Sequence, residues 1–209
     1  ITGHRLLTKE QMDKVKPLME RAIQNIMFAV REHNPVAEFV ALCPLAEGAD
    51  TLFANVALSM ELPLKLMLPF EVGEYLKTFT NDTVRQEFYD VYNRVDKSHI
   101  SIVGRKTGEE LNELYLLMGK KLVEQTDYLI AVWNGKAGQG KGGTGDIVAY
   151  AIEKRKDILI LNPEDKQPHI NYLHHEHYKR KKEQEIIDIA DTNHLLYFIE
   201  EKQHEYDTN

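Results

Sequence analysis

Short apolar runs alternate along this chain with segments whose apolar residues recur at helical spacing. The apolar runs lie at 39–43, 64–68, 100–103, 128–133 and 157–161. Runs of this length that do not alternate with polar residues are typical of strands buried on both faces. Ile1 and Thr2, which Gly3 follows, predict the carboxyl-terminal tip of one more strand at the start of the sequence.

Helices are predicted between these strands. Apolar residues recur at helical spacing over 9–33, 52–60, 109–124 and from 147 onward, and a further helix is expected from about Asn81. Thr8 and Gln11 have the spacing of a capping box at the start of the first helix. Pro17 lies within that helix, so we expect either a kink or a later helix start.

Strands that alternate with helices predict an α/β fold with a mostly parallel, doubly wound sheet and helices on both faces. Ligands of such sheets bind beyond the carboxyl ends of the strands, near the point where the strand order reverses. The loops at those ends are 3–8, 43–50, 69–80, 103–108 and 133–145. We therefore expect the functional residues in these loops.

The pattern changes after Asn162. Residues 163–185 carry four histidines and a basic run at 179–182, and apolar residues return over 186–199. We expect residues 1–162 to form the α/β domain. Residues 163–209 are expected to form an extension packed on it, with a loop, a helix and a closing strand at 195–199.

Composition narrows the function classes. The chain has 209 residues and a net charge of −7, which argues against non-specific binding to nucleic acids or anionic membranes. No apolar run approaches the ~20 residues of a membrane helix, and Cys43 is the only cysteine. A reducing, cytoplasmic compartment is expected. The sequence opens at Ile1 without a methionine, so we expect a domain cut from a longer protein.

The stretch 127–146 carries the strongest chemical signal. It combines the buried strand 128–133, a loop with six glycines and a helical pattern that begins at Ile147. Amides at a helix N-terminus attract anions, and glycine lets a ligand approach the backbone closely. Phosphate binding is the favoured interpretation, and a flexible loop without a ligand is the alternative. The spacing fits neither a Walker loop nor, with its late glycines, a dinucleotide fingerprint.

Other loops offer polar side chains with two interpretations each. Arg5, with His4 as a second donor, has the chemistry to clamp a phosphate, but an ion pair with a nearby acid explains Arg5 equally well. Asp50 is expected to cap the following helix, and Glu47 either does the same or binds a ribose hydroxyl. Trp133 either stacks on a base or packs in the core.

Two segments of the extension have a simpler interpretation. His174, His175, Glu176 and His177 are residue types that bind zinc, but adjacent ligands rarely converge on one ion. We therefore predict a solvated loop and no metal site there. The basic run 179–182 is expected to be an exposed helix face.

Five blocks in order are similar to the SLOG superfamily of Rossmann-like domains, which are related to the Smf/DprA proteins and to the Lonely Guy phosphoribohydrolases. The resemblance covers residues 1 to about 162. The blocks are Ile-Thr-Gly-His-Arg at 1–5, Pro-Leu-Ala-Glu-Gly-Ala-Asp at 44–50, Leu-Pro-Phe at 68–70, Asp-Tyr-Leu-Ile-Ala-Val-Trp-Asn-Gly at 127–135 and Gly-Gly-Thr-Gly-Asp at 142–146.

The resemblance implies a nucleotide or nucleotide-derivative ligand, such as NAD or ADP-ribose, with its phosphates on the 142–145 loop. It also implies a homo-oligomer and leaves room for a fused effector domain; no cofactor is expected. The residues that the resemblance and the loop positions together assign to the ligand are Gly3, His4, Arg5, Glu47, Gly48, Lys120, Trp133, Asn134, Gly142, Gly143, Thr144, Gly145 and Asp146.

Two functions follow from this resemblance, and a domain that keeps the fold without a ligand site is a third possibility. The phosphoribohydrolases use a Pro-Gly-Gly-x-Gly-Thr-x-x-Glu motif, but here Asp146 stands in place of its threonine and Ala149 in place of its glutamate. A carboxylate that assists glycosidic cleavage is then missing unless Glu47 or Asp146 substitutes for it. A sensor that binds nucleotide derivatives in bacterial signalling or defence is therefore favoured. The N-glycosidic hydrolase and a non-catalytic interaction domain are the alternatives.

Overall fold

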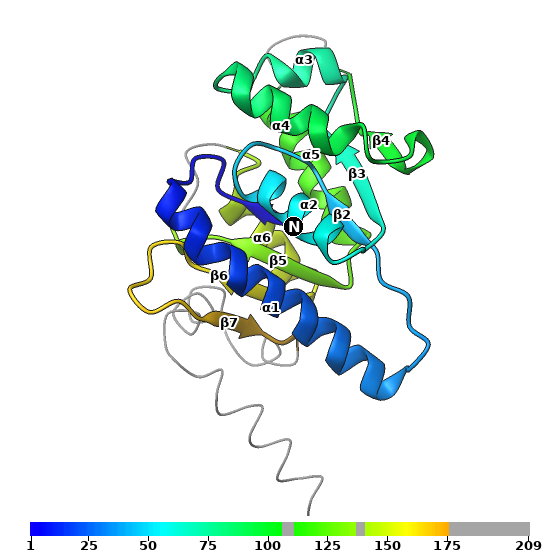
Figure 1. The fold of residues 1–209 in the computed structure, drawn as a ribbon, viewed down its shortest axis with the longest axis vertical. Coiled ribbons are helices and arrows are strands. Elements are labelled where there is room, and N and C mark those ends of the chain that lie inside the picture. The colour runs from blue at the N-terminus through cyan, green and yellow to red at the C-terminus, as the bar shows by residue number, and fades with distance from the viewer. Residues whose placement is uncertain (106–110, 137–140, 176–209) are drawn as a thin grey trace, which may run out of the picture.

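The structure is a computed structural model, and it describes residues 1–105, 111–136 and 141–175 (Figure 1). Its fold is α/β and Rossmann-like, as the sequence predicts. The elements in chain order are β1 (Thr2–Gly3), α1 (Lys9–His33), β2 (Ala41–Cys43), α2 (Ala49–Ser59), β3 (Leu64–Leu68), α3 (Val72–Leu76), α4 (Asp82–Tyr92), the 3-10 helix η1 (Lys97–His99), β4 (Ile100–Ile102), α5 (Leu111–Glu124), β5 (Tyr128–Val132), α6 (Thr144–Glu153), β6 (Asp157–Leu161) and β7 (Ile170–Leu173).

The strands form two sheets that meet at β1. One sheet has the order β1-β5-β6-β7 and the other the order β2-β3-β4, and all pairs except β6–β7 are parallel. The terminal amino group of Ile1 donates to the carbonyl of Leu42 at 3.1 Å and so joins β1 to β2. The strand order across the molecule therefore reverses between β1 and β5, which is the switch point of a doubly wound sheet.

Alternate residues of β5 and β6 face two separate cores. Ile130 and Val132 of β5 pack into the core that includes buried residues of α1 and α2. Leu129 and Ala131 pack into the core that includes buried residues of α5 and α6. Because successive side chains of a strand point to opposite faces, each strand needs an apolar residue at every position. The unbroken apolar runs of the sequence are explained by this arrangement.

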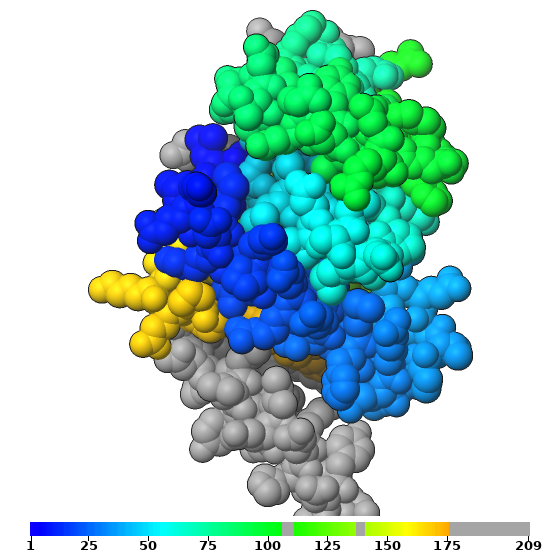
Figure 2. Space-filling model, in the orientation of Figure 1, coloured from blue at the N-terminus to red at the C-terminus, as the bar shows by residue number. Residues whose placement is uncertain are grey.

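Helix α1 begins at Lys9 with the predicted capping box, because Thr8 and Gln11 exchange hydrogen bonds. The helix continues through Pro17, so the later start considered for it does not occur. In the space-filling view α1 lies obliquely across the molecule, beside residues 163–168 (Figure 2). Lys14 Nζ donates to the carbonyl of Asp165 at 3.2 Å there.

The segment between β3 and β4 forms the upper part of the molecule in Figure 1. A helix from Asn81 was predicted, and Asn81 is the N-cap of α4. The short helix α3 was not predicted, because the polar residues around it hide its few apolar positions. Phe70, Tyr75, Phe79 and Phe88 pack edge to face in this region, with ring centroids 5.1–6.1 Å apart.

The extension contributes one strand that the sequence analysis missed. Strand β7 pairs antiparallel with β6, with Ile158 opposite Leu173. A run of four residues between histidines and a proline gives too weak a pattern to predict a strand. The helix and strand predicted over 186–199 lie outside the described residues. Over the described residues, no helix is long and apolar enough to cross a membrane.

Candidate functional site

The two loops at the switch point are joined by His4. The amide of His4 donates to the carbonyl of Val132 at 3.1 Å, which continues the pairing of β1 with β5. The amide of Asn134 donates to His4 Nε2 at 3.2 Å, so the imidazole is an acceptor at this nitrogen. Two residues that were assigned to the ligand separately, His4 and Asn134, therefore contact each other, and the histidine fixes the path of the loop after β5.

The loop after β1 also lies directly against the start of α2. The amide of Ala49 donates to the carbonyl of His4 at 3.1 Å. Gly48 has a φ of +84°, and a Cβ at this position would lie 2.2 Å from the carbonyl oxygen of Arg5. Only glycine fits this backbone and this approach. Gly48 therefore positions the two loops, and this is a structural role for a residue that the sequence analysis assigned to the ligand.

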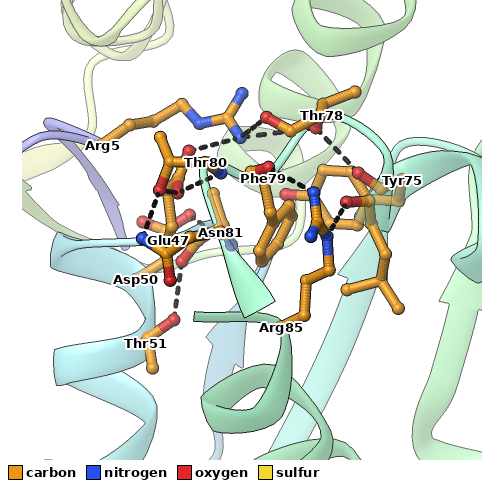
Figure 3. Close-up of polar contacts among 12 residues, drawn as sticks. Arg5, Glu47, Asp50, Thr51, Tyr75, Thr78, Phe79, Thr80, Asn81 and Arg85 are labelled. Carbon is orange, nitrogen blue, oxygen red and sulfur yellow. Dashed lines mark hydrogen bonds and ion pairs between the residues drawn. The ribbon is translucent and has the colours of Figure 1, made fainter. Parts of the chain in front are cut away.

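Arg5 forms an ion pair with Glu47 (Figure 3). Its Nη2 lies 2.9 Å from Glu47 Oε1 and 3.0 Å from the carbonyl of Thr78. The other oxygen of Glu47 accepts hydrogen bonds from the amide and hydroxyl of Thr80, at 3.0 and 2.8 Å. The ion pair that was the alternative for Arg5 is therefore present, and both oxygens of Glu47 are held by the protein.

The loop that receives Arg5 is itself fixed by α4. Arg85 donates from Nε to the carbonyl of Leu76 at 3.0 Å and from Nη2 to the carbonyl of Phe79 at 2.8 Å (Figure 3). These bonds hold the turn that carries Thr78 and Thr80. The sequence analysis placed this loop at the site but singled out neither threonine. The only sequence feature that indicated a functional role for this loop was its position after a predicted strand.

Arg5, Glu47 and Gly48 line a groove of about 440 Å³ between the loop after β1, the start of α1, α2 and α4. The groove walls are mostly apolar, with polar groups from Thr8, Asn55, Thr80 and Glu87. The Nε of Arg5 is buried and has no hydrogen-bond partner among the described residues. The described residues of the glycine loop before α6 do not line this groove.

Asp50 lies in the first turn of α2 but is not its N-cap. The N-cap is Gly48, and the Asp50 carboxylate accepts from the amide of Ala46 at 3.2 Å instead. The residue is 5% exposed, and its Oδ1 has no hydrogen-bond partner in the described part of the chain. Burial raises the pKa of Asp50 to about 7. The capping role predicted for Asp50 is replaced by a buried link between loop and helix.

The predicted phosphate loop begins helix α6. Gly143 is the N-cap, and no side chain of the described residues caps the helix. Gly142 has a φ of +81°, and a Cβ there would lie 2.6 Å from the amide nitrogen of Leu116, so the loop packs tightly against α5. The amide of Gly142 donates to Asp146 Oδ2 at 2.7 Å. One amide of the loop is therefore already paired with a carboxylate of the protein.

The next three amides, of Gly143, Thr144 and Gly145, have no acceptor among the described residues. The first amides of a helix have no partner inside it and need a side chain, water or a ligand. Tyr115 of α5 lies against Gly142 and donates from its hydroxyl to Thr78 Oγ1 at 3.3 Å. Thr78 in turn contacts Arg5, so polar residues connect the start of α6 to the Arg5–Glu47 pair.

Two further predicted ligand residues are engaged elsewhere. Trp133 is 4% exposed and packs in the core with α5 and α6, and its Nε1 donates to the carbonyl of Lys136 at 2.8 Å. Of the two interpretations of Trp133, packing in the core is the one that the structure supports. Lys120 Nζ lies 5.0 Å from the centre of the Tyr150 ring, beyond the first turn of α6.

Asn134 uses its side chain to brace the loop that follows β5. Its Nδ2 donates to Glu164 at 2.7 Å, and Lys136 Nζ reaches the same carboxylate at 2.8 Å. These two donors lower the pKa of Glu164, with the Lys136 hydrogen bond as the larger cause. The predicted site residues thus fall into two groups, Arg5–Glu47–Gly48 at the groove and Gly142–Asp146 at α6, with His4 and Asn134 at the switch point.

Searches of protein-family models and of curated proteins gave no match to this chain.

Proposed function

We propose that this domain binds a nucleotide or a nucleotide derivative and acts as a sensor of it, with a phosphate at the amides of Gly143, Thr144 and Gly145. The observation that carries the proposal is the uncapped start of α6 next to the switch point of the sheet. An anion there gains hydrogen bonds from amides that have no acceptor in the described part of the chain, together with the favourable end of the helix dipole.

The position of this helix in the fold supports the proposal. Helix α6 follows β5, which borders the switch point, and the loop between them leaves the carboxyl end of that strand. Ligands of open α/β sheets bind at this place. Glycines at 142, 143 and 145 keep side chains away from the approach of a ligand.

The charged side chains near the start of α6 give the proposed site little net positive charge. Lys141 is a nearby cation, but its Nζ lies 2.7 Å from Glu113 Oε1. Asp146 is an acid in the first turn of α6. A phosphate monoester or diphosphate therefore binds through hydrogen bonds to amides more than through net charge. A diphosphate-linked nucleotide such as NAD or ADP-ribose suits such a site as well as AMP does.

The hydrolase alternative has weaker support. Its two candidate acids, Glu47 and Asp146, accept hydrogen bonds from protein groups. The carboxyl group whose pKa burial raises to about 7 is that of Asp50, which lies in the first turn of α2 and not in the loop before α6. Binding without turnover therefore fits the described geometry better.

A pair of variants at Thr144 tests the phosphate site. Thr144 is the first residue of α6, where proline is well tolerated, and Gly143 has the extended backbone that a residue before proline prefers. Thr144→Pro removes one amide donor and keeps the helix, whereas Thr144→Ala removes only the hydroxyl. Since a hydrogen bond to a charged group contributes roughly 1.5–3 kcal/mol, Thr144→Pro should weaken binding about 10-fold or more relative to Thr144→Ala.

Binding is measured by thermal shift and calorimetry with AMP, ADP-ribose, NAD and inorganic phosphate. A ligand at 100 times its dissociation constant should stabilise the wild type by about 2.7 kcal/mol. Equal affinities of the two variants for every ligand would contradict the proposed phosphate position. Chromatography of the same mixtures tests for turnover, and released base or ribose 5-phosphate would establish the hydrolase instead.

A further inference from the structure

A cluster of metal-ligating side chains lies where β6 begins and β7 ends. Asp157 is the first residue of β6, and His174 and His175 follow the last residue of β7. The antiparallel register places Ile158 opposite Leu173, so Asp157, which precedes Ile158, and His174, which follows Leu173, are also neighbours. This end of β6 is opposite to its carboxyl end, so the cluster is separate from the switch point.

The three side chains converge on one another. His175 Nδ1 lies 3.0 Å from Asp157 Oδ1, and His174 Nε2 lies 4.0 Å from the same oxygen. One potential ligand atom from each of the three residues lies within 4.8 Å of the others. The rings of His174 and His175 are 4.2 Å apart between centroids, at an angle of 35°.

This convergence removes the objection, raised by the sequence, that adjacent histidines rarely bind the same ion. Neighbouring side chains of a strand point to opposite faces, and two adjacent histidines then have no common ligand. Here β7 ends at Leu173, so the chain leaves the strand conformation at the two histidines and both rings lie on the same side. The third ligand, Asp157, is remote in the sequence, and nothing in the histidine-rich segment itself points to it.

The carboxylate of Asp157 is held in place by a backbone amide. It is 13% exposed at the side chain and accepts from the amide of His175 at 2.8 Å. Such outer contacts orient a metal ligand before the ion arrives, and they commonly accompany carboxylate and histidine ligands.

We propose that Asp157, His174 and His175 bind a zinc ion. One carboxylate oxygen and two imidazole nitrogens form a ligand set that zinc accepts, with metal–ligand distances of about 2.0–2.2 Å. Donor atoms around a tetrahedral ion of this size are ~3.3 Å apart, close to the 3.0 and 4.0 Å found here. The histidines are partly exposed, so a fourth ligand has access from solvent.

Zinc competition against a chromophoric chelator tests the proposal on the 209-residue chain after removal of bound metal. Asp157→Asn is the decisive variant, because it removes the anionic ligand and keeps an oxygen that accepts from the amide of His175. We expect its zinc affinity to fall at least about 10-fold, the lower limit seen when only an outer contact is lost. His174→Gln and His175→Gln should give similar losses, and His33→Gln, an exposed histidine of α1, should give none.

Cobalt substitution gives a second readout that a purely structural role would not change. The wild type with Co²⁺ should show the intense visible absorption of a four-coordinate site, and Asp157→Asn should lose it. Unchanged zinc affinity in Asp157→Asn would overturn the proposal, because the ion would then bind the histidine-rich run alone. A wild type that does not compete with the chelator would overturn it as well. Should Asp157→Asn fail to fold without metal, the two histidine variants decide the question by the same criteria.

Discussion

Asp50 is a buried carboxyl group with an incomplete set of hydrogen bonds. One of its oxygens accepts from the amide of Ala46, and the other has no partner among the described residues. A charge in this position is poorly solvated, and this burial raises the pKa of Asp50 from 3.8 to about 7. The folded protein therefore holds the Asp50 proton more tightly than the unfolded chain does.

This difference predicts a pH dependence of stability. Between the unfolded pKa of 3.8 and the folded pKa of about 7, the folded state binds more protons, so the free energy of unfolding falls as the pH rises through this window. The slope from this one group is up to about 1.4 kcal/mol per pH unit. Urea unfolding from pH 5 to 8 should show this fall in the wild type.

The variant Asp50→Asn should remove that contribution, because an amide does not titrate. Asp13→Asn, at an exposed position of α1, is the control and should keep the wild-type slope. The difference between the wild type and each variant cancels the titration of the histidines. Parallel pH profiles for the wild type and Asp50→Asn would show that Asp50 is charged at neutral pH in the folded protein.

At the scale of elements, the start of helix α2 is fitted to the loop that follows β1. The N-cap Gly48 has φ and ψ of +84° and −119°, a region that side chains strongly disfavour. The carbonyls of His4 and Arg5 occupy the space where a side chain would begin. The contact fixes the loop that carries Arg5, and so the groove beside it depends on this glycine.

The variant Gly48→Ala should lower the free energy of unfolding by more than about 2 kcal/mol, since backbone strain and a steric clash add together. The control is Gly73→Ala in α3, where an added Cβ meets nothing within 4 Å. Alanine there should be neutral or stabilise by up to about 1 kcal/mol, because it favours the helix. Urea denaturation of both variants gives the comparison. Equal effects of the two substitutions would mean that the loop and α2 can separate without loss.

At the scale of the whole molecule, the larger of the two hydrophobic cores joins the two sheets. The larger cluster contains Cys43 and Leu66 of the β2-β3-β4 sheet together with Ile130 and Leu159 of the other sheet. Cores that share side chains in this way unfold together. The described part of the chain is therefore expected to unfold as one cooperative unit.

A distant reporter tests this cooperativity. Phe88 of α4 is fully buried in the aromatic group of the upper part, whereas Trp133 packs in the other cluster with α5 and α6. Phe88→Ala should lower the free energy of unfolding by about 3–5 kcal/mol. The urea midpoint seen by Trp133 fluorescence and the midpoint seen by far-ultraviolet circular dichroism should shift together. A fluorescence midpoint that stays at its wild-type value would show two units that unfold separately.

Most of the fold could be predicted from local patterns. The buried strands, the capping box at Thr8 and the start of α4 at Asn81 each depend on residues close together in the sequence. Helix α3 and strand β7 could not be predicted, because each is short and is stabilised by packing or pairing with distant residues. For the candidate site, the loops were predictable, but the roles within them were not. Glu47 is held by Thr80 and Arg5, and no local pattern indicates those contacts.

The sequence by itself determined which segments are buried and in what order strands and helices alternate, because hydrophobic burial and helix capping act on neighbouring residues. Only the tertiary structure decided which polar side chains meet. Arg5 faces Glu47 and Thr78, and Asp157 faces His175, across separations of many residues. Such pairs form because strand order and register place chain segments side by side, and a polar group that loses water on burial must then find its partner on whichever segment lies next to it.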